Sequence, residues 1–457
     1  MEREKLASRL GFIMLSAGSA IGIGNVWKFP YVTGQAGGGY FVLIYLLFLL
    51  LIGIPLVSME FAVGRGSQKS PLLSFGALEP TKKNWNVWGY ACLIGNYLII
   101  MFYTTVTGWM LNYFYKLAAG HMEGLKSEQI NQIFTNMIGN SPEQIFWMGL
   151  VVIIGISVCY GGLQNSLEKI TKWMMMALFV VMIFLAGYGM TMGGAKEGLS
   201  FFLTPNFENM QKVGFLKVVV MAMNQAFFTL GIGVGSMAIF GSYIGKEHRL
   251  FGESIQICIL DTLVALTSGL IIFPLCYTYN VNVGAGPSLV FITLPNVFAN
   301  MQMGRFWGGL FFLFLSFAAL STIFSVFENI VCMIMETFSI SRKKSCILNL
   351  FSIFILSVPC ALGFNEWNWS WLKVFGGTIL NLEDFLLSNI FLPIGALCYL
   401  IFCTRDCGWG WNNYFKEVNE GEGLAVKPWM RGYLTYVLPF IIIFIILYGI
   451  WEKFFGA

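Results

Sequence analysis

Long apolar segments recur along the whole chain and limit its possible folds more than any other feature. A helix needs about 20 mostly apolar residues to cross a bilayer. Eleven stretches approach or exceed that length, at residues 10–33, 39–64, 87–116, 144–160, 167–190, 216–244, 252–280, 305–338, 346–363, 382–403 and 432–452. The stretch 284–300 is also apolar, but Pro287 and Pro295 interrupt it, so we expect a re-entrant or capping loop there. The sequence therefore predicts an all-α polytopic membrane protein with eleven spans.

The composition is that of a protein whose main solvent is lipid. Hydrophobic residues make up 57% of the 457 residues and charged residues only 11%, whereas soluble domains carry roughly 25% charged residues. A water-soluble chain of this size could not cover its surface with so few charges. The net charge of +4 is small, and we attribute it to membrane orientation and expect no nucleic-acid partner.

The distribution of lysine and arginine predicts the orientation in the membrane, because cytoplasmic segments are enriched in both. With the N-terminus in the cytoplasm, the inner segments hold 18 of these residues and the outer segments hold 8, with Lys28 left inside the membrane. An odd number of spans then places the C-terminus outside. We predict a multi-pass protein of the cell membrane.

Two of the predicted spans carry clustered glycines, which disfavour a helix interior. The first contains Gly22-Ile23-Gly24 and the sixth contains Gly231-Ile232-Gly233. Small residues also allow close packing of membrane helices, and either segment alone leaves that alternative open. The pair favours two helices broken at matching places, which indicate a transporter's binding site.

These breaks predict a five-plus-five inverted repeat with broken first and sixth helices and one extra C-terminal helix. The expected divisions are a cytoplasmic tail at 1–9, a first repeat at 10–190, a second repeat at 191–403, a cytoplasmic loop at 404–431 and helix 11 at 432–457.

Five charged residues lie at predicted membrane depth: Lys28, Glu60, Asp261, Glu328 and Asp384. Such residues are costly and mark candidate functional sites, although each can also be a structural clamp between helices. For Glu60, which follows a proline near the end of the second span, we favour a clamp on unwound backbone. For Glu328 the sequence leaves open whether the residue is part of a functional site or a structural clamp. Asp261 lies mid-span without a basic neighbour, and a sodium ion would be a natural partner.

Several motifs resemble the neurotransmitter:sodium symporter family, and the resemblance covers nearly the whole chain. They are RLG at 9–11, GIGNVWKFP at 22–30, GGG at 37–39, GIP at 53–55 followed by Glu60 and GR at 64–65, and QAFFTL at 225–230 followed by Gly233 and Gly235. The short second outer loop, 117–143, lacks cysteine. The chain therefore looks most like the bacterial eleven-helix amino-acid transporters of the family, which implies a bacterial inner membrane.

The resemblance implies two sodium sites. The first would use the Ala20 carbonyl, Asn25, Thr229, Asp261 and the substrate carboxylate. The second would use the carbonyls of Gly18, Ile21 and Ala318 with the hydroxyls of Ser321 and Thr322. From the residue types alone, Ser321 and Thr322 could equally bond back to their own helix.

The resemblance also implies a substrate site and two gates. The substrate amine and carboxylate would meet Ala20, Ile23, Gly24, Phe228, Thr229 and the Tyr103 hydroxyl. Specificity for the substrate side chain would come from Tyr103, Phe228, Gly231, Val234, Thr322 and Val326. Phe228 and Tyr103 would close over the substrate. The outer gate would be Lys28 with Asp384, and the inner gate Arg3 with Glu336, near Tyr243.

The sequence departs from the family pattern at several of these positions. Lys28 replaces the usual arginine, which loosens the expected outer gate because lysine lacks the bidentate fork. Asp261 replaces the asparagine of many relatives, so we expect its carboxylate to supply the negative charge that some relatives take from chloride. Gly231 and Val234 replace bulkier groups, which predicts room for a large apolar or aromatic side chain.

The resulting expectation is a sodium-coupled secondary active symporter of hydrophobic or aromatic amino acids that works by alternating access. A channel would need a continuous polar lining, and the deep charges are few. A membrane enzyme would need a nucleophile and base or a metal cluster, and the two distant histidines, His121 and His248, offer neither. A non-transporting sensor could have the same binding site, and only a measurement of uptake against a gradient distinguishes a transporter from a sensor.

Overall fold

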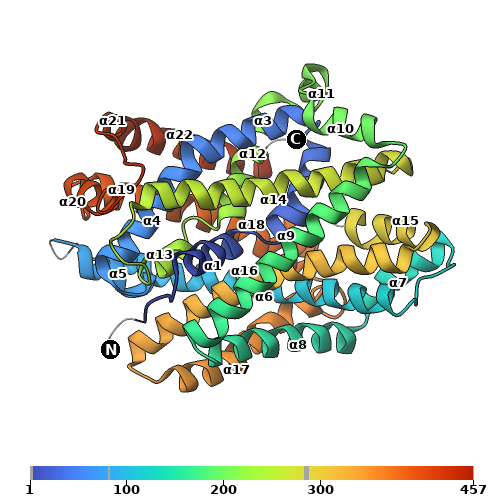
Figure 1. The fold of residues 1–457 in the computed structure, drawn as a ribbon, viewed down its shortest axis with the longest axis horizontal. Coiled ribbons are helices and arrows are strands. Elements are labelled where there is room, and N and C mark those ends of the chain that lie inside the picture. The colour runs from blue at the N-terminus through green and yellow to red at the C-terminus, as the bar shows by residue number, and fades with distance from the viewer. Residues whose placement is uncertain (1–3, 81–82, 282–287, 456–457) are drawn as a thin grey trace.

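The computed structural model describes residues 4–80, 83–281 and 288–455, and these residues are almost entirely helical. They contain no β-strand, and one isolated bridge joins His248 to Glu422. The helices run roughly parallel or antiparallel in one bundle (Figure 1). The predicted all-α architecture is confirmed.

Nine helical segments of the described chain are long and apolar enough to cross a membrane. They are α3–η2–α4 (Gly39–Ser67), α6 (Asn86–Ala118), α8 (Ser141–Tyr160), η3–α9 (Leu163–Met190), α14 (Leu250–Thr278), α16 (Gly304–Phe338), α17 (Arg342–Leu362), α18–η6–α19 (Ile379–Thr404) and α21–η7–α22 (Met430–Trp451, with α22 reaching Phe455). Two bent pairs raise the number to as many as eleven, by length and composition.

The first bent pair is the broken first span. It joins α1 (Arg9–Ala20) to η1 and α2 (Gly24–Gln35) with a bend of 51°. The second pair joins α11 (Phe207–Val213) to α12 (Phe215–Leu230) at 90°. Beyond α12 the chain unwinds and continues as α13 (Ser236–Gly241), so we take α12 and α13 together as the sixth span, with α11 outside it.

Short helices cover the two ends of the bundle. The helices α5 (Pro71–Leu78) and α20 (Trp411–Val418) lie at one end, whereas α7 (Ser127–Gly139), α10 (Ala195–Leu203) and α15 (Leu294–Asn300) lie at the other (Figure 1). The segment Leu289–Asn300 is apolar but too short to be counted as a span. Its Phe291 packs against Trp27, Trp109 and Tyr113, so it caps the bundle interior. Residues 284–287 of the predicted loop lie outside the described residues.

Wider, π-helical turns punctuate the spans, and prolines explain most of them. Within the described residues, such turns end two residues before Pro30, Pro55, Pro295, Pro393 and Pro439. They are η1 (Gly24–Lys28), η2 (Leu49–Gly53), η4 (Leu289–Thr293), η6 (Leu387–Phe391) and η7 (Tyr433–Val437). A proline ring clashes with the carbonyl four residues earlier and lacks an N–H, and widening the preceding turn accommodates both defects. The turn η3 (Leu163–Glu168) has no such proline.

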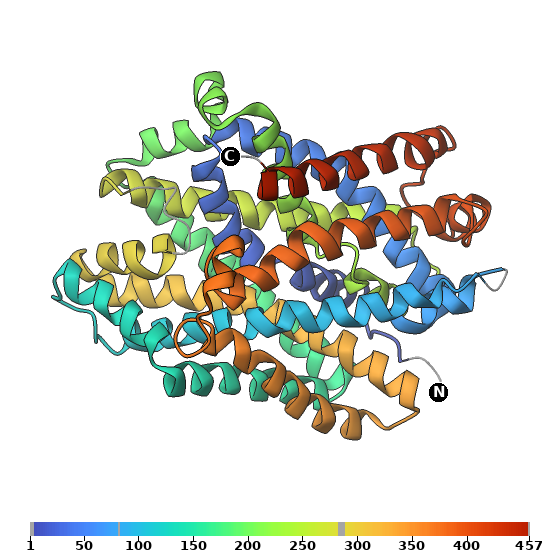
Figure 2. The same ribbon diagram turned by 180° about the vertical axis from the view of Figure 1, so that it is seen from behind.

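The long helix α16 lies at the centre of the bundle. Of its most apolar 18-residue window, 83% is buried, against 28% for the segment that ends in α22. Figure 2 shows α22 along the outside of the bundle, where an extra C-terminal helix is expected. The broken α1 packs against α16, so the first break lies deep in the protein interior.

Candidate functional site

The first span is interrupted at residues 21–23. The helix α1 ends at Ala20, and Ile21 has extended backbone, with φ −71° and ψ 105°. The Gly22 N–H donates to Asn25 Oδ1 (3.0 Å) instead of to a helical carbonyl, and the Ile23 N–H donates to the Tyr103 hydroxyl (2.6 Å). The predicted break is confirmed, and it turns polar backbone groups toward the interior.

The sixth span is interrupted between Leu230 and Ser236 by alternating glycines in left-handed backbone. Their φ values are +58° at Gly231, +104° at Gly233 and +75° at Gly235. Such angles are readily adopted only by glycine, so unwinding explains these residues better than close packing does.

Glu60 of α4 stabilises this second break. Its Oε1 accepts the Gly233 N–H (2.6 Å) and its Oε2 accepts the Met237 N–H (3.0 Å). Both donors would otherwise be buried without partners, which costs free energy. The predicted clamp is confirmed.

A first cluster of oxygen ligands surrounds Asp261 of α14. Its Oδ1 accepts hydrogen bonds from Asn25 Nδ2 (2.8 Å) and the Thr229 hydroxyl (3.2 Å). The Tyr45 hydroxyl is 3.5 Å from Oδ2. All four side chains are buried, and Asp261 forms no ion pair with any residue that the structure describes. One uncompensated carboxylate beside the Thr229 and Tyr45 hydroxyl oxygens suits a hard monovalent cation such as sodium.

A second cluster joins α16 to the end of α1. The Ser321 hydroxyl lies 2.8 Å from the Ala318 carbonyl and 3.1 Å from that of Ile21. The Thr322 hydroxyl lies 3.2 Å from the Ile21 carbonyl and 3.4 Å from that of Gly18. Ser321 therefore bonds both to its own helix, as the simpler alternative supposed, and to Ile21, whereas the contacts of Thr322 cross to the first span. Three carbonyl and two hydroxyl oxygens thus converge between α16 and the end of α1, and oxygen atoms are the ligands that hard cations prefer.

A small cavity of about 30 Å³ lies between the clusters, with room for about two water molecules. It combines backbone and hydroxyl groups with an apolar wall. Its lining includes Ser19, Ala20, Gly24, Ile99, Tyr103, Phe228, Thr229, Gly231, Ser236, Thr322, Val326, Leu387 and Leu392. The structure thus brings most of the predicted substrate residues together.

Two predicted substrate residues lie beside this cavity rather than along its wall. Ile23 reaches it only through the backbone N–H that donates to Tyr103. The Val234 side chain packs against Gly95 of α6, and its carbonyl accepts from Asn96 Nδ2 (2.8 Å). In unwound backbone the helical period no longer tells which way a side chain points, so the sequence could not place Val234.

An ion pair lies above the cavity at the end that carries α7, α10 and α15. Lys28 Nζ is 2.7 Å from Asp384 Oδ1 and 3.1 Å from the Ser388 hydroxyl. The same ammonium lies 3.9 Å from the centre of the Phe228 ring, a favourable cation–π contact. Lys28, Asp384 and Phe228 thus form one contact that covers the cavity from this side.

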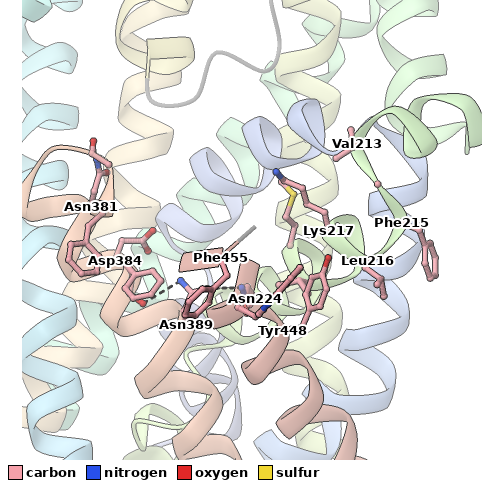
Figure 3. Close-up of a pocket in the computed structure, with 18 residues that line it drawn as sticks. Val213, Phe215, Leu216, Lys217, Asn224, Asn381, Asp384, Asn389, Tyr448 and Phe455 are labelled. Atoms are coloured by element: carbon pink, nitrogen blue, oxygen red, sulfur yellow. Dashed lines mark hydrogen bonds between the residues drawn. The ribbon is translucent and has the colours of Figure 1, made fainter. Parts of the chain in front are cut away.

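A much larger pocket of about 1220 Å³ lies beside this ion pair, between α12, α18 and α22. Figure 3 shows Asp384, Asn389 and Asn224 along it, with Lys217 and Leu216 on α12 and Tyr448 and Phe455 on α22. Asn224 Nδ2 donates to Asn389 Oδ1 (3.0 Å) and so ties α12 to η6 at its floor.

Tyr243 and Glu328 form a polar cluster at the opposite end. Arg342 binds both oxygens of the buried Glu328 (2.7 and 2.9 Å), and the Tyr243 hydroxyl donates to Glu328 (2.8 Å). Glu336 lies in the adjacent pocket of about 400 Å³ and accepts the Ser70 N–H (2.8 Å). The predicted partner of Glu336, Arg3, lies outside the described residues.

Comparison with known proteins agrees with this geometry. The profile of the sodium:neurotransmitter symporter family matches residues 3–123 and 126–454. The chain belongs to this family. An uncharacterized sodium-dependent transporter of Haemophilus influenzae is 31% identical over 97% of both chains, and the transporter YhdH of Bacillus subtilis is 35% identical over 87% of this chain and 86% of its own.

Family relatives are also known in animals and among solved structures. The sodium-dependent serotonin transporter of Drosophila melanogaster is 27% identical over 98% of this chain and 76% of its own length. A crystal structure of MhsT in complex with L-phenylalanine superposes with a TM-score of 0.88 at 36% identity, covering 98% of this chain and 99% of MhsT. Membership makes the protein a sodium-dependent symporter, and the predicted fold class is confirmed.

Some residues of this symporter site were missed by sequence reasoning. Ile99, Leu387 and Leu392 line the cavity, but in apolar spans nothing distinguishes them from lipid-facing leucines. Tyr45 is equally inconspicuous in the second span. The partner of Glu328 was visible in principle, because Arg342 follows it by 14 residues at a predicted helix end.

Proposed function

We propose that the protein is a sodium-coupled symporter of hydrophobic or aromatic amino acids that works by alternating access. The observation that carries this proposal is the meeting of two broken helices at one closed cavity, flanked by two oxygen clusters. Broken helices offer unpaired N–H groups to an anion and carbonyls to cations. A zwitterion and sodium ions match this arrangement.

Two sodium sites would use the two clusters. The first would combine Asp261, Asn25, Thr229 and the Ala20 carbonyl with the substrate carboxylate, and the distances around Asp261 support it. The second would combine Ser321 and Thr322 with the carbonyls of Gly18, Ile21 and Ala318. A sodium ion that enters down a 100 mV potential contributes about 2.3 kcal/mol.

The substrate would lie with its carboxylate near the Tyr103 hydroxyl and the N–H groups of Ile23 and Gly24. Its side chain would face Ile99, Phe228 and Leu387, which supports an apolar substrate. MhsT, which is 36% identical to this chain, was solved in complex with L-phenylalanine, and this also supports an apolar substrate. Because the cavity holds only about 30 Å³, these side chains must move apart to admit a substrate.

The two ends would open alternately. Lys28 with Asp384 would form the outer gate, and Glu336 with Arg3, near Tyr243, the inner gate. This assignment places the N-terminus in the cytoplasm and the C-terminus outside. In the proposed inverted repeat, the halves 10–190 and 191–403 each contribute one broken helix.

The test is binding of labelled L-phenylalanine, L-tryptophan, L-leucine, glycine and L-alanine to the purified protein, in sodium and in potassium. We expect binding only in sodium, with the large apolar amino acids ahead of glycine and alanine. Preference for glycine and alanine would contradict the substrate class, and equal binding in potassium would contradict the coupling.

A pair of threonine variants tests the second sodium site. Thr322→Val removes a hydroxyl that crosses to α1, whereas Thr267→Val removes one that bonds only to its own helix at Leu263. Losing one oxygen ligand of a cation is worth about 1.5–3 kcal/mol, so Thr322→Val should weaken sodium binding about tenfold to a hundredfold. Thr267→Val should leave it unchanged, and an equal loss in both variants would reject the site.

A further inference from the structure

Glu383 is a buried acid that none of the sites above uses. It lies on α18 (Ile379–Leu386) and is 3% exposed. Neither of its carboxyl oxygens has a hydrogen-bond partner, and it forms no ion pair with a residue that the structure describes. In a membrane-spanning segment this is an unusual position for a carboxyl group.

Among the residues that the structure describes, no cationic side chain pairs with Glu383. The helix α18 packs mainly against α6, α17, η5 (Ser370–Phe375) and η6. The Cys360 thiol of α17 faces the carboxyl group, and the Thr105 hydroxyl of α6 lies by that thiol. The charged residue of η5, Lys373, is exposed, η6 carries none, and Lys116 of α6 pairs with Glu143.

The other described neighbours of Glu383 supply no counter-ion to it either. On α18 itself, Asp384 pairs with Lys28. The helix α22 packs on Phe385 through Phe454, and Phe385 is turned by about 200° around the helix from Glu383. The side chains of Glu452 and Lys453 on α22 are outside the described set.

A carboxylate ion is not stable in such a place. Burying a charge without a partner costs far more than burying a neutral acid, so the group takes up a proton instead. The neutral acid gains one O–H donor, which can serve the sulfur of the Cys360 thiol beside it. Glu383 therefore carries a proton in the arrangement of helices seen here.

The position of Glu383 couples this proton to the Lys28–Asp384 pair. Glu383 and Asp384 are neighbours on an eight-residue helix that begins at the Thr378 cap and ends in the π-helical turn η6. A rigid movement of α18 that separates Asp384 from Lys28 would also shift Glu383 relative to α6 and α17 and so change the surroundings of its carboxyl group.

We propose that Glu383 is a proton-binding site that is occupied while the Lys28–Asp384 end is closed and is emptied when this end opens. The proton comes from the solvent on that side and returns to it. Acid on that side therefore favours the closed end, and base favours opening. This inference rests on the proposed alternating access.

Infrared difference spectra test the protonation itself, without any transport. The spectrum of the wild type minus that of Glu383→Gln at pH 7 should contain the carbonyl band of a neutral carboxylic acid. Glu366→Gln, at an exposed residue that bonds Ser141, should instead remove a carboxylate band. A carboxylate band from Glu383→Gln would overturn the proposal. Glu383→Asp provides a second measurement, because this variant should shift the carbonyl band of the neutral acid rather than abolish it.

Release of bound labelled amino acid from the purified protein tests the coupling. In the wild type, release should slow as pH falls, by up to tenfold per pH unit for one linked proton. Glu383→Gln resembles the protonated acid at every pH, so this variant should release the labelled amino acid slowly at every pH. Glu366→Gln should keep the wild-type pH dependence.

The two proposals fail in different ways. If neither the wild type nor Glu383→Gln binds an amino acid in sodium, the proposed function fails while the infrared result still decides the proton site. If both bind and both release with the same pH dependence, the proton site is overturned and the proposed function stands.

Discussion

At the scale of single residues, the account depends on charges placed where lipid-spanning helices rarely carry them. Among the described residues, Asp261 has one amide N–H and two hydroxyl partners and no cation, whereas each carboxyl oxygen of Glu60 accepts a backbone N–H. The two acids therefore differ in kind. Asp261 offers a carboxylate whose charge a bound sodium ion would neutralise, and Glu60 holds a backbone shape.

The charge of Asp261 should make chloride unnecessary. We expect wild-type uptake to be the same in chloride-free buffer, because the carboxylate itself balances the sodium charge. Asp261→Asn keeps the size of the side chain and removes its charge. An interaction with a charged group contributes about 1.5–3 kcal/mol, so the apparent sodium affinity of this variant should fall about tenfold to a hundredfold. Flux measured against sodium concentration in chloride and in gluconate checks both statements. Strict dependence of the wild type on chloride would contradict them.

Lys28 should slow the escape of bound substrate. Its pair with Asp384 is partly exposed, with side-chain exposures of 16% and 33%, and is worth at most about 1 kcal/mol. The contact with Phe228 adds about 0.5–1 kcal/mol. Lys28→Met should therefore release labelled substrate about twofold to thirtyfold faster. Lys116→Met breaks the pair with Glu143 away from the cavity and should leave the release rate unchanged. If Lys28→Met releases substrate at the wild-type rate, Lys28 is not part of a gate.

Sequence reasoning found the charged and glycine residues of the site and missed its apolar and phenolic partners. Asp261 is conspicuous as a charge within an apolar span, the family resemblance indicated Asn25 and Thr229, and the structure brings the three together. Tyr45 and Leu387 look like any other residue of a membrane helix, because only the fold decides whether they face the cavity. Glu383 was overlooked beside Asp384, since two adjacent acids point to different faces of one helix.

At the scale of elements, two interrupted helices create the site. Clustered glycines made both breaks predictable, because glycine both weakens a helix and tolerates left-handed backbone. The π-helical turns were not predicted. Their prolines are visible in the sequence, but a proline can bend, end or widen a helix, and the packing of neighbouring helices selects among these outcomes.

Gly233 should tolerate no side chain. Its φ of +104° is strained for alanine, at a cost of about 1–3 kcal/mol, and a Cβ would press on the Leu392 carbonyl. Gly233→Ala should lower the melting temperature in detergent and abolish sodium-dependent substrate binding. Gly187→Ala, in an α9 position with open space around it, should be neutral or slightly stabilising. Normal binding by Gly233→Ala would show that the break does not need its present shape.

At the scale of the whole molecule, the bundle has two unlike ends around one closed cavity. The helices α5 and α20 lie in segments that the distribution of lysine and arginine predicts to be cytoplasmic. The fold class could be predicted from the sequence because lipid imposes both the length and the composition of a span. The contacts between distant spans could not be predicted, since apolar helices pack through shape rather than through pattern.

Cys407 offers a direct test of orientation with the native chain. Of the ten cysteines, Cys407 is exposed and the others are buried, and the predicted loop 404–431 places it in the cytoplasm. A membrane-impermeant thiol reagent should label it only after intact cells are permeabilised, and Cys407→Ser should lose the label. Labelling of intact cells would reverse the assigned orientation.

Uptake into sealed liposomes tests the central claim most directly. Purified protein is reconstituted, an inward sodium gradient is imposed, and accumulation of labelled phenylalanine, tryptophan or leucine is followed with potassium in place of sodium as the control. The account predicts accumulation above the external concentration in sodium, and collapse when the gradient is dissipated. Equilibration without accumulation, or binding without any uptake, would contradict it.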